Sequence, residues 1–402
     1  MAPAPATAYA HPMTSAADDA QDAAGPVGPE ALAACALSAV PGLGPGSLAR
    51  LAEAFGSLEA ALAAGPRGIL AQHRFLDPQL DARAVRHLSC APDLASAGLQ
   101  ILRAARAAGA RVVLRGDPAY PGLLRDIERP PSLLYVRGAL DPAAARIAVV
   151  GSREADEEGL RLAREIAEDL ASAGVQVVSG GARGIDAAAH EGALWGQGTT
   201  AAVLGCGIDV AYPPAHGPLF ERLAQGGGAV VSEFPPGAPG SRMNFPRRNR
   251  TISGLSGAVV VVRASLASGA LVTAREALRQ GRLLFAVPGL AGEPLCAGPN
   301  RLLAEGAARP ARSAADVLRA LGWQPPLGRP NRPEGSRHPR APGLDDPGER
   351  LLGLLERRPL HLDELAKRAG MGAQQALRTL QDLELKGLCL QRPGKYYLRW
   401  RA

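Results

Sequence analysis

At 402 residues, the chain is long enough for two to four domains, and its formal net charge of +7 points towards an anionic partner. Of the 45 basic residues, all but Lys367, Lys386 and Lys395 are arginine, so the placement of the arginines says more than their number. The five cysteines are far apart and form no CxxC pair, which argues against a disulfide framework and a zinc site. No apolar run approaches the length of a membrane span, which argues against a transmembrane protein.

The N-terminal segment, residues 1–30, is rich in Ala, Pro and Asp and lacks the basic and apolar regions of a signal peptide. We expect a disordered tail and a cytoplasmic protein. Residues 31–100 are rich in Ala and Leu at helical spacing, with Gly42, Gly44 and Gly46 between two helical patterns and Ser47 as the expected N-cap. This pattern predicts a helix-hairpin-helix or SAM-like domain, which either contacts a phosphate or only packs.

Residues 101–324 alternate short apolar runs with helical patterns over 157–173, 184–196 and 269–280. Apolar strands separated by helices predict an α/β domain, a Rossmann-like doubly wound sheet whose strands are mostly parallel. The runs are "RIAVVGS", "VQVVSG", "TAAVLG", "AVVSE", "AVVVV" and "LLFAVPG".

The C-terminal part begins with a Pro-rich segment, residues 325–347, which we expect to be a linker. Residues 348–402 show three helical patterns and then two short strands around "RPGK", the pattern of a winged helix. On its third helix, Gln374, Arg378 and Gln381 share one face. That face would suit DNA contact, protein docking or a purely structural module.

In an open α/β sheet, ligands bind beyond the carboxyl ends of the strands. In this sequence the strands lead into Gly151-Ser152-Arg153, a Gly180–Gly184 loop, Gly205-Cys206-Gly207 and "EFPPGAPGSRMNFPRRNR". Glycine lets a phosphate approach the backbone, helix N-termini supply N–H donors, and arginine supplies charge. The sequence therefore predicts a phosphate-binding edge.

The stretch "NFPRRNR" places Arg247, Arg248 and Arg250 within four positions. The nearest acids in the sequence are Glu233 upstream and Glu276 downstream. We therefore expect these arginines to lack acidic partners and, together with Arg153 and Arg183, to face an anionic chain.

Several enzyme classes do not fit. The sequence has no GxxxxGK[ST] and no GxGxxG, which argues against a P-loop NTPase and a dinucleotide oxidoreductase. Asp186 and His190 lie one helical turn apart, but nothing resembles a nucleophile elbow, so a cap and a packing residue are expected. We predict no catalytic residues, no metal and no cofactor.

Only 4% of the residues are aromatic, too few for extended stacking platforms. Tyr212, Phe234 and Phe245 are the aromatic residues nearest the edge, and core packing is the expected role of each. Binding should therefore depend mainly on phosphates.

The motifs "RIAVVGSR", "VVSGGARGIDAAAHEGAL", "VVSEFPPG", "NFPRRNRTISGLS" and "SGALVTAREALRQGR" occur in this order over about 200 residues. In this the chain resembles the DNA-processing protein A (DprA/Smf) family. The resemblance implies a non-enzymatic protein that binds single-stranded DNA with little sequence preference and helps load RecA recombinase onto incoming strands during natural transformation. It also implies a homodimer formed through the Rossmann-like domain.

By this resemblance, the DNA-binding residues are expected to be Ser152, Arg153, Gly180, Arg183, Arg247, Arg248, Asn249, Arg250, Ser268, Gly269 and Thr273. The chain departs from the family at Arg263, where relatives commonly carry an acid, and at Ala215, where they often carry lysine. Arg263 would enlarge the basic surface.

The alternative function is that of a hydrolase that cleaves nucleoside monophosphates on a related Rossmann-like fold. That family carries "PGGxGTxxE", and the stretch "AVPGLAGEP" of this chain lacks the pattern.

Overall fold

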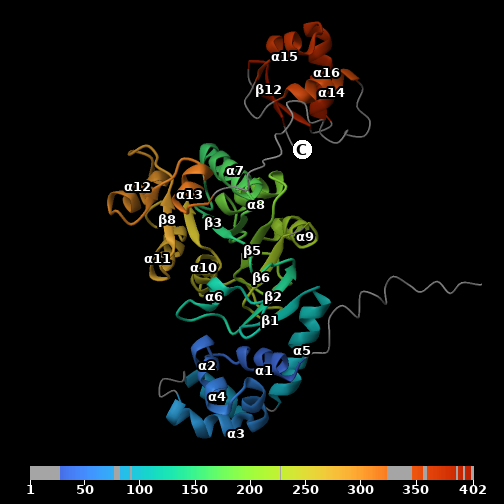
Figure 1. Ribbon diagram of the computed structural model, residues 1–402. Coiled ribbons are helices and arrows are strands. Elements are labelled where there is room, and N and C mark those ends of the chain that lie inside the picture. The colour runs from blue at the N-terminus through green and yellow to red at the C-terminus, as the bar shows by residue number, and fades with distance from the viewer. Residues whose placement is uncertain are drawn as a thin grey trace, which may run out of the picture. The chain divides into compact units, whose positions relative to one another are not determined.

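The structure is a computed structural model (Figure 1). The residues it describes fall into two compact units, within Met1–Gln324 and Pro325–Ala402. They are residues 28–76, 82–90, 93–226, 228–323, 346–355, 360–385, 388–392 and 394–399. The predicted linker therefore lies almost wholly outside the described residues, and so do residues 1–27 of the predicted tail.

The first unit is built on a nine-stranded sheet in the order β1-β2-β6-β5-β4-β3-β7-β8-β9. The seven strands from β6 to β9 are parallel, and β1 and β2 add an antiparallel edge. All six predicted strands are present, so the predicted Rossmann-like sheet is confirmed. The strands are β1 (Arg111–Leu114), β2 (Leu133–Gly138), β3 (Arg146–Val150), β4 (Gln176–Ser179), β5 (Thr200–Leu204), β6 (Ala229–Ser232), β7 (Ala258–Val261), β8 (Leu283–Ala286) and β9 (Arg309–Pro310).

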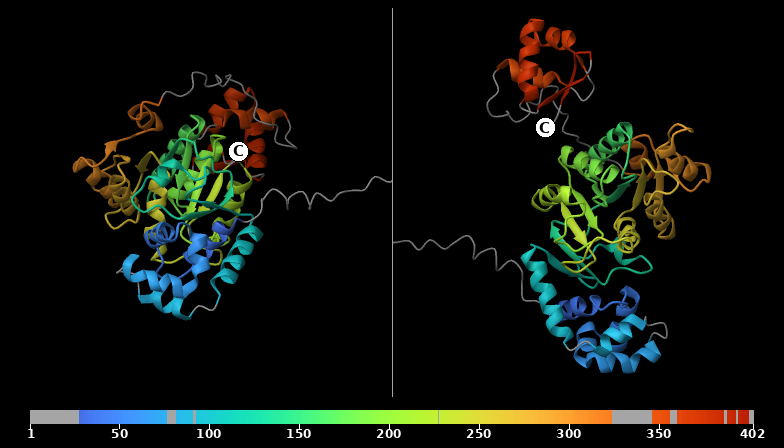
Figure 2. Two further views of the ribbon diagram at one scale, coloured as in Figure 1. Left: turned by 60° about the horizontal axis from the view of Figure 1, so that its bottom comes forward. Right: turned by 180° about the vertical axis from the view of Figure 1, so that it is seen from behind.

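Helices cover both faces of this sheet because its strands are apolar on both faces (Figure 2). In β3, Ile147 and Val149 pack into one core and Ala148 and Val150 into the other. The first face is covered by α7 (Glu157–Ser172), α8 (Ile185–Trp195), α13 (Ala314–Ala320) and, towards β6, α9 (Gly217–Gln225). The second is covered by α6 (Gly122–Arg125), α10 (Asn244–Gly254), α11 (Ala270–Arg279) and α12 (Ala297–Ala304).

The strand order reverses between β3 and β7. From β3 the chain adds β4, β5 and β6 on one side, and it then returns to place β7 and β8 on the other. The loops that follow these strands meet at the carboxyl edge of the sheet, which is where an open α/β sheet binds its ligands.

Five helices precede the sheet: α1 (Pro29–Ser38), α2 (Pro45–Phe55), α3 (Leu58–Leu76), α4 (Ala82–Cys90) and α5 (Leu94–Ala107). The turn before α2 contains Gly42 at φ +91°, a conformation that favours glycine. The predicted cap is wrong, because α2 starts at Pro45 after Gly44 and Ser47 lies within the helix. These helices share a core with the sheet, in which the Tyr135 hydroxyl donates to Cys35 Sγ over 3.6 Å.

The second unit is the predicted winged helix. Three helices, α14 (Asp346–Leu354), α15 (Leu362–Ala369) and α16 (Ala373–Leu385), pack with a three-stranded sheet in the order β10-β12-β11. The strands are β10 (Leu360–His361), β11 (Cys389–Arg392) and β12 (Tyr396–Arg399). On α16, Gln374, Arg378 and Gln381 are exposed, whereas Leu380 and Leu383 are buried.

Candidate nucleic-acid interface

The arginine-rich stretch forms the first turns of α10, which begins at Asn244 after the loop that follows β6. Successive helical residues project about 100° apart, so neighbouring arginines point in different directions. Accordingly, Arg247 is exposed, Arg248 is buried and Arg250 is partly buried. The three side chains cannot act as one surface.

Arg248 lies inside the protein, with 5% of its surface exposed. Its Nη1 donates to the carbonyl oxygen of Gly180 and, over 2.6 Å, to that of Val203. The guanidinium thereby joins the ends of β4 and β5. The prediction that Arg248 contacts DNA is wrong for this structure, because a side chain this buried does not present its N–H groups to a DNA strand.

The buried Asp186 carboxylate accompanies Arg248. Burial raises the pKa of Asp186, and the Arg248 guanidinium opposes that rise. Burial likewise lowers the pKa of Arg248, and Asp186 opposes that. A Cβ atom at Gly180 would collide with both side chains, so this packing requires glycine at position 180.

Glu233, directly after β6, overturns the expectation that the arginines lack acids. Its side chain is 3% exposed, and its Oε2 lies 3.4 Å from Arg250 Nη2 and 3.8 Å from Arg247 Nη2. Its Oε1 accepts a hydrogen bond of 3.1 Å from the Thr251 hydroxyl. The Arg250 side chain is only 18% exposed and therefore has a structural role as well.

This pairing leads to a prediction for Arg250→Ala. Breaking a buried pair costs about 3–5 kcal/mol, and because Arg247 and Thr251 remain at Glu233 we expect a loss of about 2 kcal/mol in the free energy of unfolding. Denaturant unfolding measures this loss.

The loss should also depend on pH. Burial raises the pKa of Glu233 and Arg250 opposes the rise, so the variant's pKa should lie higher still. When an acid has a higher pKa in the folded than in the unfolded state, the protein loses stability as the pH rises through the folded-state pKa. The deficit of Arg250→Ala should therefore shrink as the pH falls from neutral into the acidic range. A variant as stable as the wild type at every pH would contradict this structural role.

Three predicted arginines are exposed at the edge: Arg153 after β3, Arg183 after β4, and Arg247, whose side chain is 50% exposed. Arg242, in the loop before α10, is exposed too and was not among the predicted residues, although it lies in the same sequence stretch. Within the described ranges, no ion pair joins Arg153, Arg183 or Arg242 to an acid. These guanidinium groups can bind an external anion.

Several of the smaller predicted residues make hydrogen bonds that hold the loops and helix starts near these arginines. The Ser152 N–H donates to the Arg263 carbonyl over 2.6 Å, and Asn249 Nδ2 donates to the Gly269 carbonyl over 3.3 Å. Ser268 Oγ accepts from the Ala270 N–H over 3.3 Å, at the start of α11. Thr273, by contrast, is 2% exposed and lies in the core, so it offers no surface to a strand.

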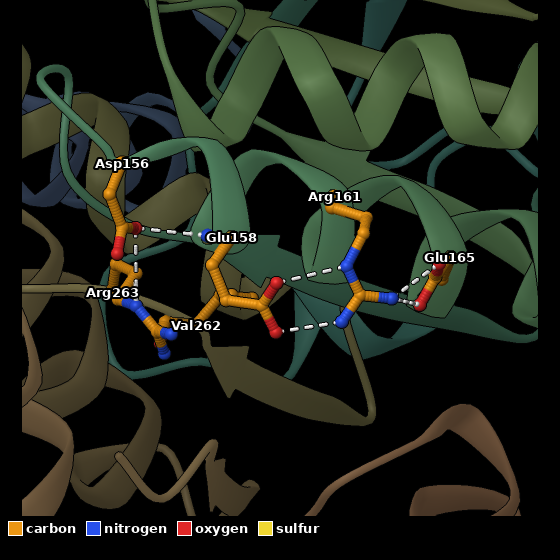
Figure 3. A network of polar contacts seen from close by, with 7 residues as sticks. Asp156, Glu158, Arg161, Glu165, Val262 and Arg263 are labelled. Carbon is orange, nitrogen blue, oxygen red and sulfur yellow. Dashed lines mark hydrogen bonds and ion pairs between the residues drawn. The ribbon is translucent and has the colours of Figure 1, made fainter. Parts of the chain in front are cut away.

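The expectation that Arg263 enlarges the basic surface is wrong. Its side chain is 7% exposed, and its Nε lies 3.3 Å from Asp156 Oδ1 (Figure 3). Asp156 in turn caps α7 by accepting from the Gly159 N–H over 2.9 Å. In the same figure, Arg161 bridges Glu158 and Glu165 further along α7. Arg263 thus ties the end of β7 to the start of α7.

Aromatic side chains lie beside the exposed arginines. The Arg153 guanidinium lies over the Phe245 ring, 5.0 Å from its centroid, and that of Arg247 lies over Phe234 at 5.1 Å. Phe234 is buried, as expected for packing, but Tyr212 is 44% exposed, so the packing role predicted for it is wrong. Its ring lies 5.4 Å from that of Phe245.

Asp186 and His190 both lie inside the protein. His190 is fully buried, its Nδ1 lies 2.7 Å from Thr200 Oγ1, and burial lowers its pKa to about 3.

Among the described His, Cys, Asp and Glu residues, no three gather where they could hold a metal ion. No helix in the described part of the chain has both the length and the apolar character required to cross a membrane.

The family model for DNA recombination-mediator protein A matches residues 111–322, more than half of the chain. The chain belongs to this family. A second model, the DprA winged helix domain, matches residues 335–395. The recombination-mediator model spans the sheet and every residue of the candidate edge.

Relatives from distant bacteria support this membership. The chain is similar to Protein Smf of Escherichia coli, at 41% identity over 70% of this chain and 76% of the relative. It is also similar to Protein Smf of Synechocystis, at 33% identity over 90% and 97%. Among solved structures, DNA processing protein A of Streptococcus pneumoniae matches with a TM-score of 0.55 and 30% identity, over 73% of this chain and 98% of that one.

Proposed function

We propose that this protein binds single-stranded DNA with little sequence preference in the cytoplasm and helps load RecA recombinase onto incoming strands. The observation that carries this proposal is the set of exposed guanidinium groups at one sheet edge: Arg153, Arg183, Arg242 and Arg247. The loops after β3, β4 and β6 and the first turn of α10 contribute them, so a flexible phosphate chain could follow them across the edge.

The chemistry of the edge favours tolerance of sequence. Contacts to phosphates carry no base information. The aromatic surface near the arginines is small and consists of Tyr212 and part of Phe245. One or two bases could stack there, which again requires no particular base, because every base has a π-face.

The loading of RecA and a homodimer formed through the Rossmann-like domain rest on the family resemblance. The exposed face of α16, with Gln374, Arg378 and Gln381, remains open to DNA contact, to protein docking or to a purely structural role. The full chain is therefore the right material for a functional test.

A strand-exchange assay with the cognate RecA tests this proposal. Single strands precoated with single-strand-binding protein should exchange slowly with RecA alone and faster once the purified protein is added. Arg153→Ala should reduce that acceleration, because it removes an exposed cation that has no acidic partner within the described ranges.

No acceleration by a protein that still binds single strands would contradict the RecA role. Release of free base from nucleoside monophosphates, lost on substitution of an edge residue, would instead favour the alternative hydrolase.

A further inference from the structure

Glu233 is an unusual residue to find beneath a surface that binds an anion. It follows the last residue of β6, and its carboxylate is almost wholly enclosed. The groups that contact it are Arg247, Arg250 and Thr251, all from α10. Burial and, second to it, the charge of Glu233 raise the pKa of Tyr120, whose hydroxyl donates to the Pro131 carbonyl over 2.7 Å.

The ion pairs at Glu233 are loose. The two N···O distances, 3.4 Å to Arg250 and 3.8 Å to Arg247, exceed the usual length of a charge-assisted hydrogen bond, about 2.7–2.9 Å. Arg250 Nε is buried without a hydrogen-bond partner, and the Arg247 side chain is half exposed. One carboxylate thus serves two cations, and the half-exposed Arg247 can still attract a second anion.

We propose that Glu233 is a positioning residue that acts as an internal anion: it holds Arg247 and Arg250 at the sheet edge in the free protein, and a strand phosphate takes over Arg247 on binding. This inference rests on the proposed binding of single-stranded DNA. Arg247 is the group that can transfer, because its pair with Glu233 is the longer and its guanidinium reaches solvent. Arg250 stays with Glu233 because it is the more enclosed.

Removing the carboxylate should therefore separate stability from binding. Without Glu233, the free protein keeps two neighbouring guanidinium groups with no counter-ion, one of them partly buried, which destabilises the fold. A bound DNA strand supplies the missing anion, so the substitution destabilises the DNA-bound state less than the free state. The variant should be less stable and yet bind more tightly.

The test compares Glu233→Gln with the wild type in binding of oligo-dT and in thermal unfolding with and without the oligonucleotide. We expect the midpoint of unfolding to fall, the affinity to rise by up to about fivefold, and the oligonucleotide to stabilise the variant more than the wild type. The matched control is Glu221→Gln. This substitution also removes one negative charge, but it breaks a 2.7 Å ion pair with Arg137. Arg137 lies opposite Val230, near the amino end of β6 and so away from the carboxyl edge, and the affinity should therefore not change.

A second measurement needs no substitution at Glu233. A phosphate beside the carboxylate should raise the pKa of Glu233, so that strand binding takes up a proton and wild-type affinity rises as the pH falls. Arg247→Ala should flatten this dependence, since it removes the group that transfers.

The outcomes separate the two claims. A wild type that does not bind oligo-dT would contradict the proposed function itself. If the wild type binds but Glu233→Gln binds equally or more weakly, the inference fails and the proposed function stands. If Glu233→Gln does not fold, a wild-type affinity for oligo-dT that does not vary with pH would likewise overturn the inference.

Discussion

Replacing Arg248 with alanine should lower the free energy of unfolding by about 3–5 kcal/mol, the cost of removing one partner from a buried charged pair. The substitution leaves Asp186 buried without its cation and leaves the carbonyl groups of Gly180 and Val203 without their donor. Urea unfolding, followed by circular dichroism, measures the loss. Lysine should not restore the wild-type stability, because its single ammonium group lacks the planar fork of the guanidinium.

The matched control is Arg242→Ala, in the loop just before α10. Arg242 is exposed and has no ion pair to an acid within the described residues, so its loss should change stability by less than about 0.5 kcal/mol. If Arg248→Ala unfolds like the wild type but no longer binds single strands, Arg248 belongs to the ligand-binding set after all.

The sheet could be predicted because its signal is local. Each central strand is a short, almost uninterrupted apolar run, and burial on both faces requires such runs wherever helices cover both sides. Glycines and arginines after the strands then located the edge, because strands that run parallel end at the same side of a sheet. The order of motifs also identified the family, which the family model confirms.

The partners of individual arginines could not be predicted, because they depend on contacts between distant parts of the chain. Glu233 is 14 residues before Arg247 in the sequence, yet it faces α10 because β6 ends beneath the first turns of that helix. Arg248 points inward and Arg247 outward owing to the helical register alone. A cluster of arginines in a sequence is therefore not a cluster in space.

Arg263 illustrates the same limit from the other side. It follows a buried strand at the carboxyl edge, as a ligand-binding arginine would, but its partner Asp156 lies at the start of a helix 107 residues earlier. Conversely, Arg242 looked unremarkable in the sequence and is exposed in the structure.

Removing Arg153, Arg183 and Arg247 together should lower the affinity for single-stranded DNA about a hundredfold, if each phosphate contact contributes about 1 kcal/mol. Oligo-dT and mixed-sequence strands should lose affinity about equally, because phosphates carry no sequence information. The fold should remain stable, since Arg153 and Arg183 are exposed and Glu233 keeps its pair with Arg250.

The salt dependence of this binding tests most directly whether the exposed arginines contact phosphates. Each phosphate that the protein neutralises on a single strand contributes about 0.7 to the slope of log affinity against log salt concentration. Titrations of oligo-dT at several salt concentrations should therefore give the triple variant a slope that is shallower than that of the wild type by about 2. A triple variant with the wild-type slope would show that these guanidinium groups do not neutralise phosphates and would contradict the account.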